Sequence, residues 1–241
     1  MPDLLVAAAL RVEARALRRG LATGGQAGVG AVSVDQAGGP AVDQTGDQAV
    51  IPAAVIPSAI VVRTGMGPVR AAAAVPRLLA IGPAVFAVAG VAGALTKLPV
   101  AGDVVVASEV RPIGAAEPVL TTNPAGLAEM LRGAGFSVHV GPVVSTDHMV
   151  HRRERISLAL SGAIAVDMET AMLAGAAGGA PFAALRVIVD TPARPLFHPA
   201  TLVSGITALR VLSRAAPILR AWAATRMTGS APRNSRSTLP K

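Results

Sequence analysis

The sequence contains no cysteine and no tyrosine, and aromatic side chains make up only 2% of its 241 residues. Without cysteine the chain can form neither a disulfide nor a thiolate metal site. Its four histidines, at positions 139, 148, 151 and 198, lack the spacing of zinc ligands, so we expect no catalytic metal and no cofactor. So few aromatic rings also argue against nucleic acid as a partner, because single-stranded bases bind largely by stacking.

Long uninterrupted apolar segments are also missing, although apolar residues make up 52% of the chain. No window reaches the roughly 18 uncharged apolar residues that a membrane-spanning helix requires. The N-terminal segment is interrupted by Arg11 and Glu13 after a short apolar run, which is unlike a signal peptide. We therefore expect a cytoplasmic protein.

Acidic residues are outnumbered, since 14 Asp and Glu stand against 22 Lys and Arg and give a net charge of +8. Part of the excess lies in residues 226–241, which carry Ser, Pro, Gly and basic residues but no acid. This composition predicts a basic disordered tail that follows a single domain of residues 1–225. Such a tail is first expected to be solvated and without a partner. Peripheral contact with an anionic membrane surface, which this charge also suits, is the alternative.

Short apolar segments that alternate with helical ones predict an α/β domain. Residues 108–123 are expected to form a loop, and residues 20–57 one or two edge strands with loops. The expected strands are 3–9, 60–63, 84–89, 104–107, 137–144, 163–166 and 184–189. The expected helices are 14–19, 69–79, 127–133, 151–160 and 202–224, with an Ala-rich helix after residue 169.

Two carboxylates, Glu169 and Asp190, each stand just after an expected strand. The helix between these strands has about the length of a parallel crossover, which would place both strand ends at one edge of the sheet. Ligands of open α/β folds bind at that edge, so the two carboxylates are expected side by side in a site. The alternative is that Glu169 caps the following helix and Asp190 caps a turn before Pro192.

Glycine-rich stretches follow two other expected strands, at residues 64–68 and 90–94. Pro68 suits the first turn of the helix that follows the first stretch. Such turns bring backbone N–H groups close to an anion or a hydroxyl-rich ligand. Ordinary tight turns have the same composition, so each stretch alone is a weak signal.

Four motifs in this order resemble one family. They are RTGMGPVRAAAA, VAGVAGAL followed by AGDVVVAS, VDMET, and LRVIVD. Over about residues 4–215 the chain resembles the nucleoside phosphorylase/nucleosidase superfamily, and within it the nucleosidases of methylthioadenosine and S-adenosylhomocysteine. It is similar still more closely, through LRVIVDTPARPL, to the hopanoid-associated members thought to remove adenine from adenosylhopane.

The resemblance implies a fold, a substrate class and an assembly. The fold is a single-domain, three-layer phosphorylase/hydrolase-like one, with a twisted mixed β-sheet flanked by helices. The substrate is a small nucleoside, lipid-linked if the hopanoid-associated likeness holds. The assembly is a homodimer in which a loop of the partner completes the 5′ side of the pocket.

The resemblance also assigns roles to individual residues. Asp190 matches the acid that protonates the purine, for which a carboxyl with a raised pKa is suited. Glu13 matches the carboxylate that activates water, and Glu169 the one that binds the ribose hydroxyls. The other matching residues are Met168, Gly65, Gly67, Ala92 and Gly93 around the sugar, and His148 and Met149 over the purine.

The sequence departs from the phosphorolytic members of the family. Val88 and Val91 stand where those members carry an arginine and a hydroxyl that bind phosphate. This favours water as the nucleophile, although Arg63 or Arg70 could still bind phosphate. The sequence thus predicts a purine nucleosidase acting on adenosylhopane. The alternatives are a methylthioadenosine/S-adenosylhomocysteine-type nucleosidase, a phosphate-dependent phosphorylase and a non-catalytic nucleoside-binding protein.

Overall fold

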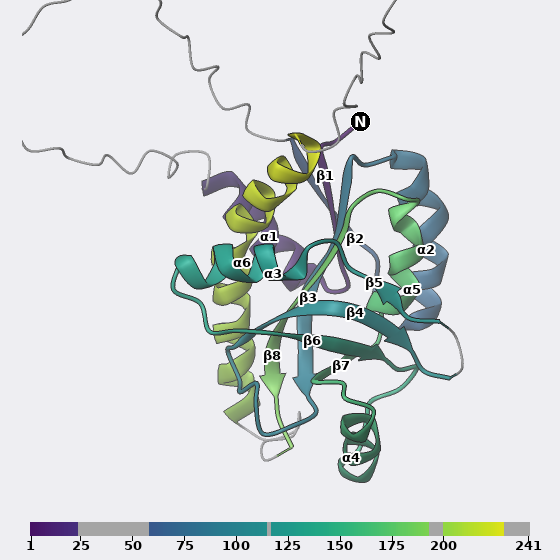
Figure 1. Cartoon of the computed structure of the whole chain (residues 1–241), viewed down its shortest axis with the longest axis vertical. Helices are drawn as coiled ribbons and strands as arrows, with labels where there is room; N and C mark the ends of the chain where they lie inside the picture. Colours follow the sequence, from purple (N-terminus) through teal and green to yellow (C-terminus); the bar gives the residue numbers. More distant parts are fainter. Residues whose placement is uncertain (24–57, 115–116, 193–199, 229–241) are drawn as a thin grey trace, which may run out of the picture.

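The structure is a computed structural model that describes residues 1–23, 58–114, 117–192 and 200–228. Most of the region expected to form edge strands and loops, residues 24–57, therefore lies outside the described residues, as do residues 229–241 of the expected tail. Figure 1 shows the arrangement of the described elements.

The strands of the described residues form one eight-stranded sheet. They are β1 (Leu4–Ala8), β2 (Ala59–Arg63), β3 (Val85–Ala94), β4 (Val104–Pro112), β5 (Val119–Leu120), β6 (Val138–Ser145), β7 (Ala165–Asp167) and β8 (Phe182–Asp190). The helices are α1 (Arg11–Thr23), α2 (Pro68–Ile81), α3 (Pro124–Gly133), α4 (Arg152–Leu160), α5 (Thr170–Ala174) and α6 (Ala200–Thr228), with a 3₁₀ turn at Gly175–Ala177.

The sheet closes on itself over part of its width. Its strands follow the order β2-β1-β3-β7-β6-β4-β5, and β8 pairs with both β3 and β4. The strands β3, β7, β6, β4 and β8 therefore form a closed ring, from which β1 and β2 extend beyond β3. Because β8 is parallel to β3 and antiparallel to β4, the sheet is mixed, as the resemblance implied.

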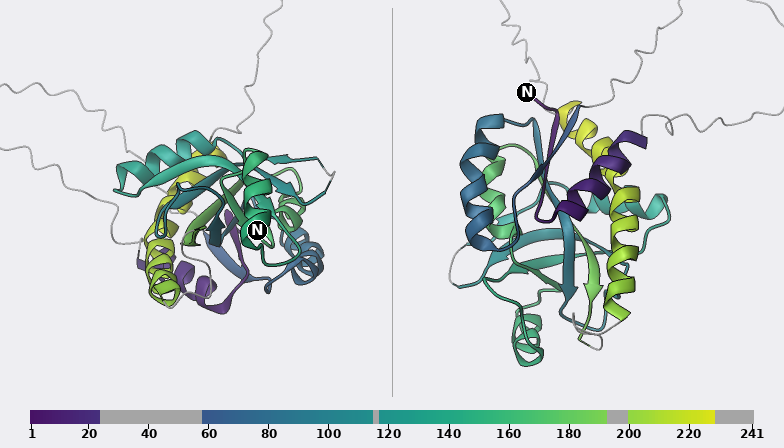
Figure 2. Two further views of the ribbon diagram at one scale, coloured as in Figure 1. Left: turned by 90° about the horizontal axis from the view of Figure 1, so that it is seen from below. Right: turned by 180° about the vertical axis from the view of Figure 1, so that it is seen from behind.

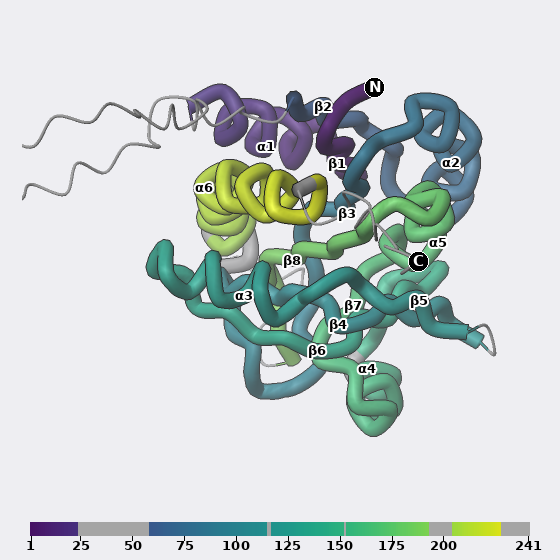
Figure 3. Tube along the Cα trace, turned by 45° about the horizontal axis from the view of Figure 1, so that its top comes forward, coloured from purple at the N-terminus to yellow at the C-terminus, as the bar shows by residue number. Residues whose placement is uncertain are grey.

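Helices cover the two faces of the sheet and make a three-layer α/β structure. In Figures 1 and 3, α1, α3 and α6 lie on one side, while α2 and α5 lie on the other. The view from behind in Figure 2 shows the same two layers. Each layer encloses its own apolar core, with Leu17 and Trp222 in one and Leu78 and Leu173 in the other.

Strand β7, which ends two residues before Glu169, and strand β8, which ends at Asp190, run in opposite directions, so the expected parallel crossover is wrong. Strand β7 is antiparallel to β3, whereas β8 is parallel to it on the other side. Both strands nevertheless reach the same point of β3, because Gly93 is the partner of Val166 on β7 and of Asp190 on β8. The two carboxylates thus meet through a shared neighbour.

Two expected loops are partly strands. Residues 90–94 continue β3, because the ladder with β8 runs on through them to Asp190. Residues 108–112 continue β4 beyond an irregularity between Ala107 and Val110, and β5 pairs with this extension. The polar residues Ser108 and Glu109 end the apolar run by which this strand was identified in the sequence, which explains why the extension was not expected.

Helices α1 and α6 pack closely at Gly20. A Cβ atom at this position would lie 1.8 Å from the carbonyl oxygen of Ser213, so only glycine fits. Helix α6 continues to Thr228, past the boundary expected at residue 225. Of the helices that the structure describes, none has both the length and the apolar character needed to cross a bilayer.

Candidate active site

A cavity of about 520 Å³ is lined by residues at the ends of β3 and β8 and by residues in and before α4. Figure 1 shows that these two strands end near α4. This volume lies in the range of small-molecule sites. Its wall is mainly apolar and comes from the residues after β1, the end of β3, the segment before α4, the β7–α5 junction and the end of β8. Four carboxylates line it: Glu13, Asp167, Glu169 and Asp190.

Glu13 lies in the first turn of α1 with only 1% of its surface exposed. Its carboxylate accepts the N–H groups of Leu10 and Val91, each at 2.8 Å. The bond to Leu10 is the reach-back that a glutamate makes at the start of a helix, and it fixes the side chain toward the cavity. Burial raises the pKa of Glu13, against the opposing positive charge of Arg186.

A glycine makes room for this arrangement. A Cβ atom at Gly90 would lie 2.5 Å from Nη1 of Arg186 and 2.8 Å from Oε1 of Glu13. The glycine-rich stretch of β3 therefore serves the close approach of side chains, rather than a turn.

The centre of the site is a buried ion pair. Nε of Arg186 lies 2.8 Å from Oδ2 of Asp167, and each side chain is 1% exposed. Nε also donates to the hydroxyl of Thr170 at 3.0 Å. Sequence reasoning assigned no role to Arg186 or Asp167. A signal was present, because Arg186 stands in the middle of the buried strand FAALRVIVD, whose only other charged residue is Asp190 at its end, and a buried charge needs a partner.

Glu169 is held by the turn before α2. Its Oε1 accepts the N–H of Gly67 at 2.7 Å. Burial raises the pKa of Glu169, while the charge of Arg186 lowers it. The side chain makes no capping hydrogen bond to α5, so the helix-capping alternative is wrong. Asp167 does the capping, since its Oδ1 accepts the N–H groups of Glu169 and Thr170, each at 3.1 Å.

Asp190 is bound by an arginine that the sequence did not single out. Its Oδ2 pairs with Nη2 of Arg155 on α4, and Nη1 of Arg155 donates to the carbonyl of Ala94 at 2.7 Å. Burial raises the pKa of Asp190, and the positive charge of Arg155 opposes this rise. A Cβ atom at Gly93 would lie 2.8 Å from Oδ1 of Asp190, which explains the glycine there. Arg155 lies among other basic residues of a charged helix, so no local signal distinguished it.

The remaining candidate residues around the cavity differ in how far they are exposed to solvent. Met168 and Ala92 line the cavity, and His148 and Met149 lie at its exposed rim. The His148 ring is hydrogen bonded to Asp147 and Glu154 on either side, which raises its pKa.

Two of the expected glycines lie outside this cavity. Gly67 contributes through its N–H to Glu169. Gly65 lines a neighbouring cavity together with Arg63 and Arg70, and its φ of 96° and the side chain of Arg70 leave no room for a Cβ atom.

The arrangement suits acid–base chemistry on a ligand of moderate size. Three carboxyl groups with raised pKa values, those of Glu13, Glu169 and Asp190, face one cavity from different elements. Among the residues that the structure describes, no group of three or more His, Asp or Glu side chains is placed to hold a metal ion.

Comparisons with known proteins agree with this picture. A family model described as "Phosphorylase superfamily" matches residues 56–219. No curated protein matches the chain.

Similar solved structures share the fold. The 5′-methylthioadenosine/S-adenosylhomocysteine nucleosidase of Neisseria meningitidis, in complex with methylthio-immucillin-A, has 20% identity and a TM-score of 0.64, over 93% of this chain and 98% of that one. The S-adenosylhomocysteine nucleosidase of Streptococcus pyogenes, in complex with 5-methylthiotubericidin, has 21% identity and a TM-score of 0.63, over 92% and 96%. Futalosine hydrolase of Helicobacter pylori has 20% identity and a TM-score of 0.62, over 92% and 96%.

Proposed function

This chain belongs to the phosphorylase superfamily, and we propose that it is a purine nucleosidase that releases adenine from a 5′-substituted adenosine. The observation that carries the proposal is the meeting of Glu13, Glu169 and Asp190 in one cavity, each with a pKa raised by burial. Structures of similar fold from Neisseria meningitidis and Streptococcus pyogenes hold nucleoside analogues, which supports this substrate class.

Asp190 is the general acid of the proposed reaction. The bond between C1′ and N9 breaks with its electrons moving into the purine, and a proton from Asp190 on N7 lets adenine leave as a neutral molecule. A carboxyl group can deliver that proton near neutral pH only if its pKa is raised, and burial supplies the rise here.

Glu13 and Glu169 act on the sugar side. Glu13 accepts a proton from the water that attacks C1′ of the oxocarbenium-like sugar, and its two backbone hydrogen bonds keep it in place. Glu169 accepts hydrogen bonds from the ribose hydroxyls, oriented by the N–H of Gly67. Met168 packs against the ribose from the cavity wall.

Water is the proposed nucleophile. The side chain of Val88 is buried in an apolar core, and the N–H of Val91 is occupied by Glu13, so neither position offers a phosphate ligand. Phosphorolysis remains the alternative, because Arg63 and Arg70 line the neighbouring cavity.

The proposed substrate is adenosylhopane, in which a large apolar group is attached at the 5′ position. The mainly apolar wall of the cavity and its exposed rim at Met149 fit such a group. Peripheral membrane contact and a homodimer belong to the same proposal. A methylthioadenosine/S-adenosylhomocysteine-type nucleosidase is the second candidate, supported by the fold of the similar structures.

The experiment that tests the proposal is adenine release, followed by chromatography, from adenosylhopane and methylthioadenosine in parallel. We expect release from adenosylhopane that does not depend on phosphate. Release from methylthioadenosine alone would show that the substrate is not lipid-linked. Release that depends on phosphate would show that phosphate, and not water, is the nucleophile. Binding of nucleosides without any release of adenine would indicate a non-catalytic protein.

The pair between Arg155 and Asp190 makes a pH prediction. Arg155→Met removes the positive charge that lowers the pKa of Asp190. Because the acid works in its protonated form, we expect the alkaline limb of the kcat/KM profile to move to higher pH. Arg155→Lys, which keeps the charge, should leave that limb closer to wild type. Arg153→Met, on the exposed side of α4, is the control, and an equal movement in that variant would contradict the assignment.

A further inference from the structure

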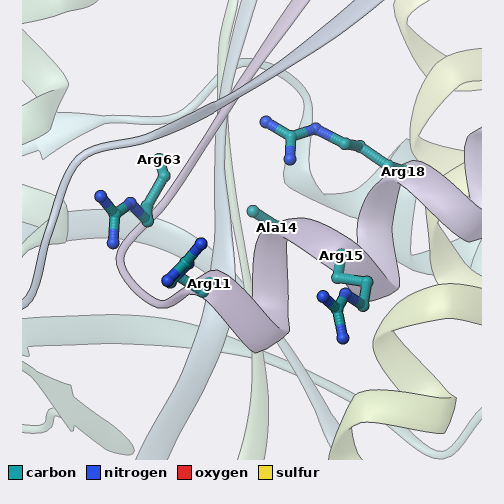
Figure 4. A pocket seen from close by; sticks show the side chains of 5 residues that line it. All are labelled: Arg11, Ala14, Arg15, Arg18 and Arg63. Atoms are coloured by element: carbon teal, nitrogen blue, oxygen red, sulfur yellow. The ribbon is translucent and has the colours of Figure 1, made fainter.

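One face of α1 consists of arginines. Arg11, Arg15 and Arg18 have the spacing i, i+4, i+7, which places them on a single stripe of a helix. All three side chains are exposed, while Glu13 and Leu17 on the opposite side are buried. Figure 4 shows the three side chains projecting from α1, with Arg63 beside them from the end of β2.

These four arginines surround a hollow without acidic lining. The cavity has a volume of about 500 Å³, and its other lining residue is Ala14. Arg18 donates to the carbonyl of Val61 at 2.8 Å, but among the described residues none of the four forms an ion pair. Exposed positive charges gathered without carboxylates attract anions.

The basic surface continues to a cavity that adjoins the candidate active site. A second cavity of about 560 Å³ is lined by Arg11, Arg63 and Arg70, and it shares Ala9, Leu10 and Met66 with the active-site cavity. We call the five residues Arg11, Arg15, Arg18, Arg63 and Arg70 the arginine face.

Large apolar side chains stand exposed beside the arginine face. Val12 is 51% exposed, Met66 55% and Val69 81%. Val12 follows Arg11 on α1, and Val69 precedes Arg70 in the first turn of α2. Basic residues mixed with exposed apolar ones are typical of surfaces that lie in a membrane interface.

We propose that the arginine face docks on an anionic phospholipid surface. The guanidinium groups bind headgroup phosphates, which suit their planar donors, and Val12, Met66 and Val69 enter the interfacial layer. A small anion would be held by an enclosed site. This surface is open and carries apolar residues among its charges, so it fits a lipid layer better. The docking itself is independent of catalysis. Its use rests on the proposed function, because docking would turn the side of the active-site cavity lined by Leu10 and Met66 toward the layer that holds a lipid-linked substrate.

The test is flotation of the full chain with vesicles of phosphatidylcholine alone or with ~30% phosphatidylglycerol, which carries the negative charge. We expect binding only to the anionic vesicles and its loss at high salt. Each arginine near such a surface is worth about a fivefold change in partition. The triple variant Arg11→Gln/Arg15→Gln/Arg63→Gln should therefore lower the partition coefficient on the order of a hundredfold.

Two controls carry the same loss of charge. Arg233→Gln/Arg236→Gln/Lys241→Gln changes the C-terminal segment, and Arg77→Gln/Arg153→Gln/Arg210→Gln changes exposed arginines elsewhere. We expect both controls to bind much more strongly than the face variant. Equal losses in all three variants, or equal binding to neutral vesicles, would overturn the proposal. Because flotation needs no turnover, docking without adenine release would leave this inference standing and refute only the proposed function.

Discussion

Asp190→Asn is expected to lower kcat for adenine release by about 10²–10⁴-fold, the contribution of a general acid. The amide keeps the shape of the carboxyl but cannot deliver a proton to N7. Its oxygen can still accept a hydrogen bond from Arg155, so the fold and nucleoside binding should largely persist. The measurements are single-turnover adenine release, the affinity for an adenosine analogue and the melting temperature.

The control for this variant is Asp3→Asn, which makes the same chemical change. Asp3 stands just before β1, at the end of that strand away from the cavity. Asp3 binds Ser58 there and does not line the cavity. We expect this control to turn over like wild type. A rate close to wild type in Asp190→Asn would show that Asp190 is not the acid. A loss of analogue binding as large as the loss of rate would indicate that Asp190 serves the ground state.

Several site residues could be predicted because they stand where strands end. Glu13, Glu169 and Asp190 each follow a short apolar run, and the ends of strands are where α/β folds place their chemistry. The order of the elements was equally accessible from the alternation of apolar and helical segments. The sequence could not show why Glu169 and Asp190 lie close together, because their proximity depends on the pairing of β3 with β7 on one side and with β8 on the other.

Closure of the sheet was beyond the reach of local patterns. The antiparallel pairing of β4 with β8 joins residues such as Val104 and Val187, which are far apart in the sequence. The residues that contact the candidate catalytic carboxylates could not be predicted either, because they also come from distant parts of the sequence. Arg155 reaches Asp190 from another element, and Gly90 is required by two side chains that come from α1 and β8. Neither contact produces a periodic pattern of residue types in the sequence.

Arg186→Met is the second large effect, on stability. At neutral pH we expect the free energy of unfolding to fall by about 3–5 kcal/mol, the cost of leaving a buried charge without its partner. Asp167 loses its ion pair. Glu13 and Glu169 lose the positive charge that stabilises their carboxylates and so opposes the rise of their pKa on burial. The measurement is the midpoint of guanidinium-induced unfolding. Arg153→Met, at an exposed position, should change stability by no more than about 0.5 kcal/mol.

The pH dependence shows whether charge is the cause. Glu13 and Glu169 have folded-state pKa values above the ordinary value of 4.5. Their protonated forms therefore favour the fold, and this stabilisation is full below pH 4.5 and is lost as the pH rises through the folded pKa. The deficit of Arg186→Met should shrink as the pH falls and grow as it rises.

Two further variants keep this prediction testable if Arg186→Met fails to fold at neutral pH. Arg186→Lys retains the charge but not the planar donors, so its deficit should be smaller. Adding Glu13→Gln to Arg186→Met should recover part of the stability, because one uncompensated carboxylate is removed. A deficit that is independent of pH and unaffected by Glu13→Gln would show that Arg186 stabilises the fold by packing. The carboxylates of the site would then not depend on its charge.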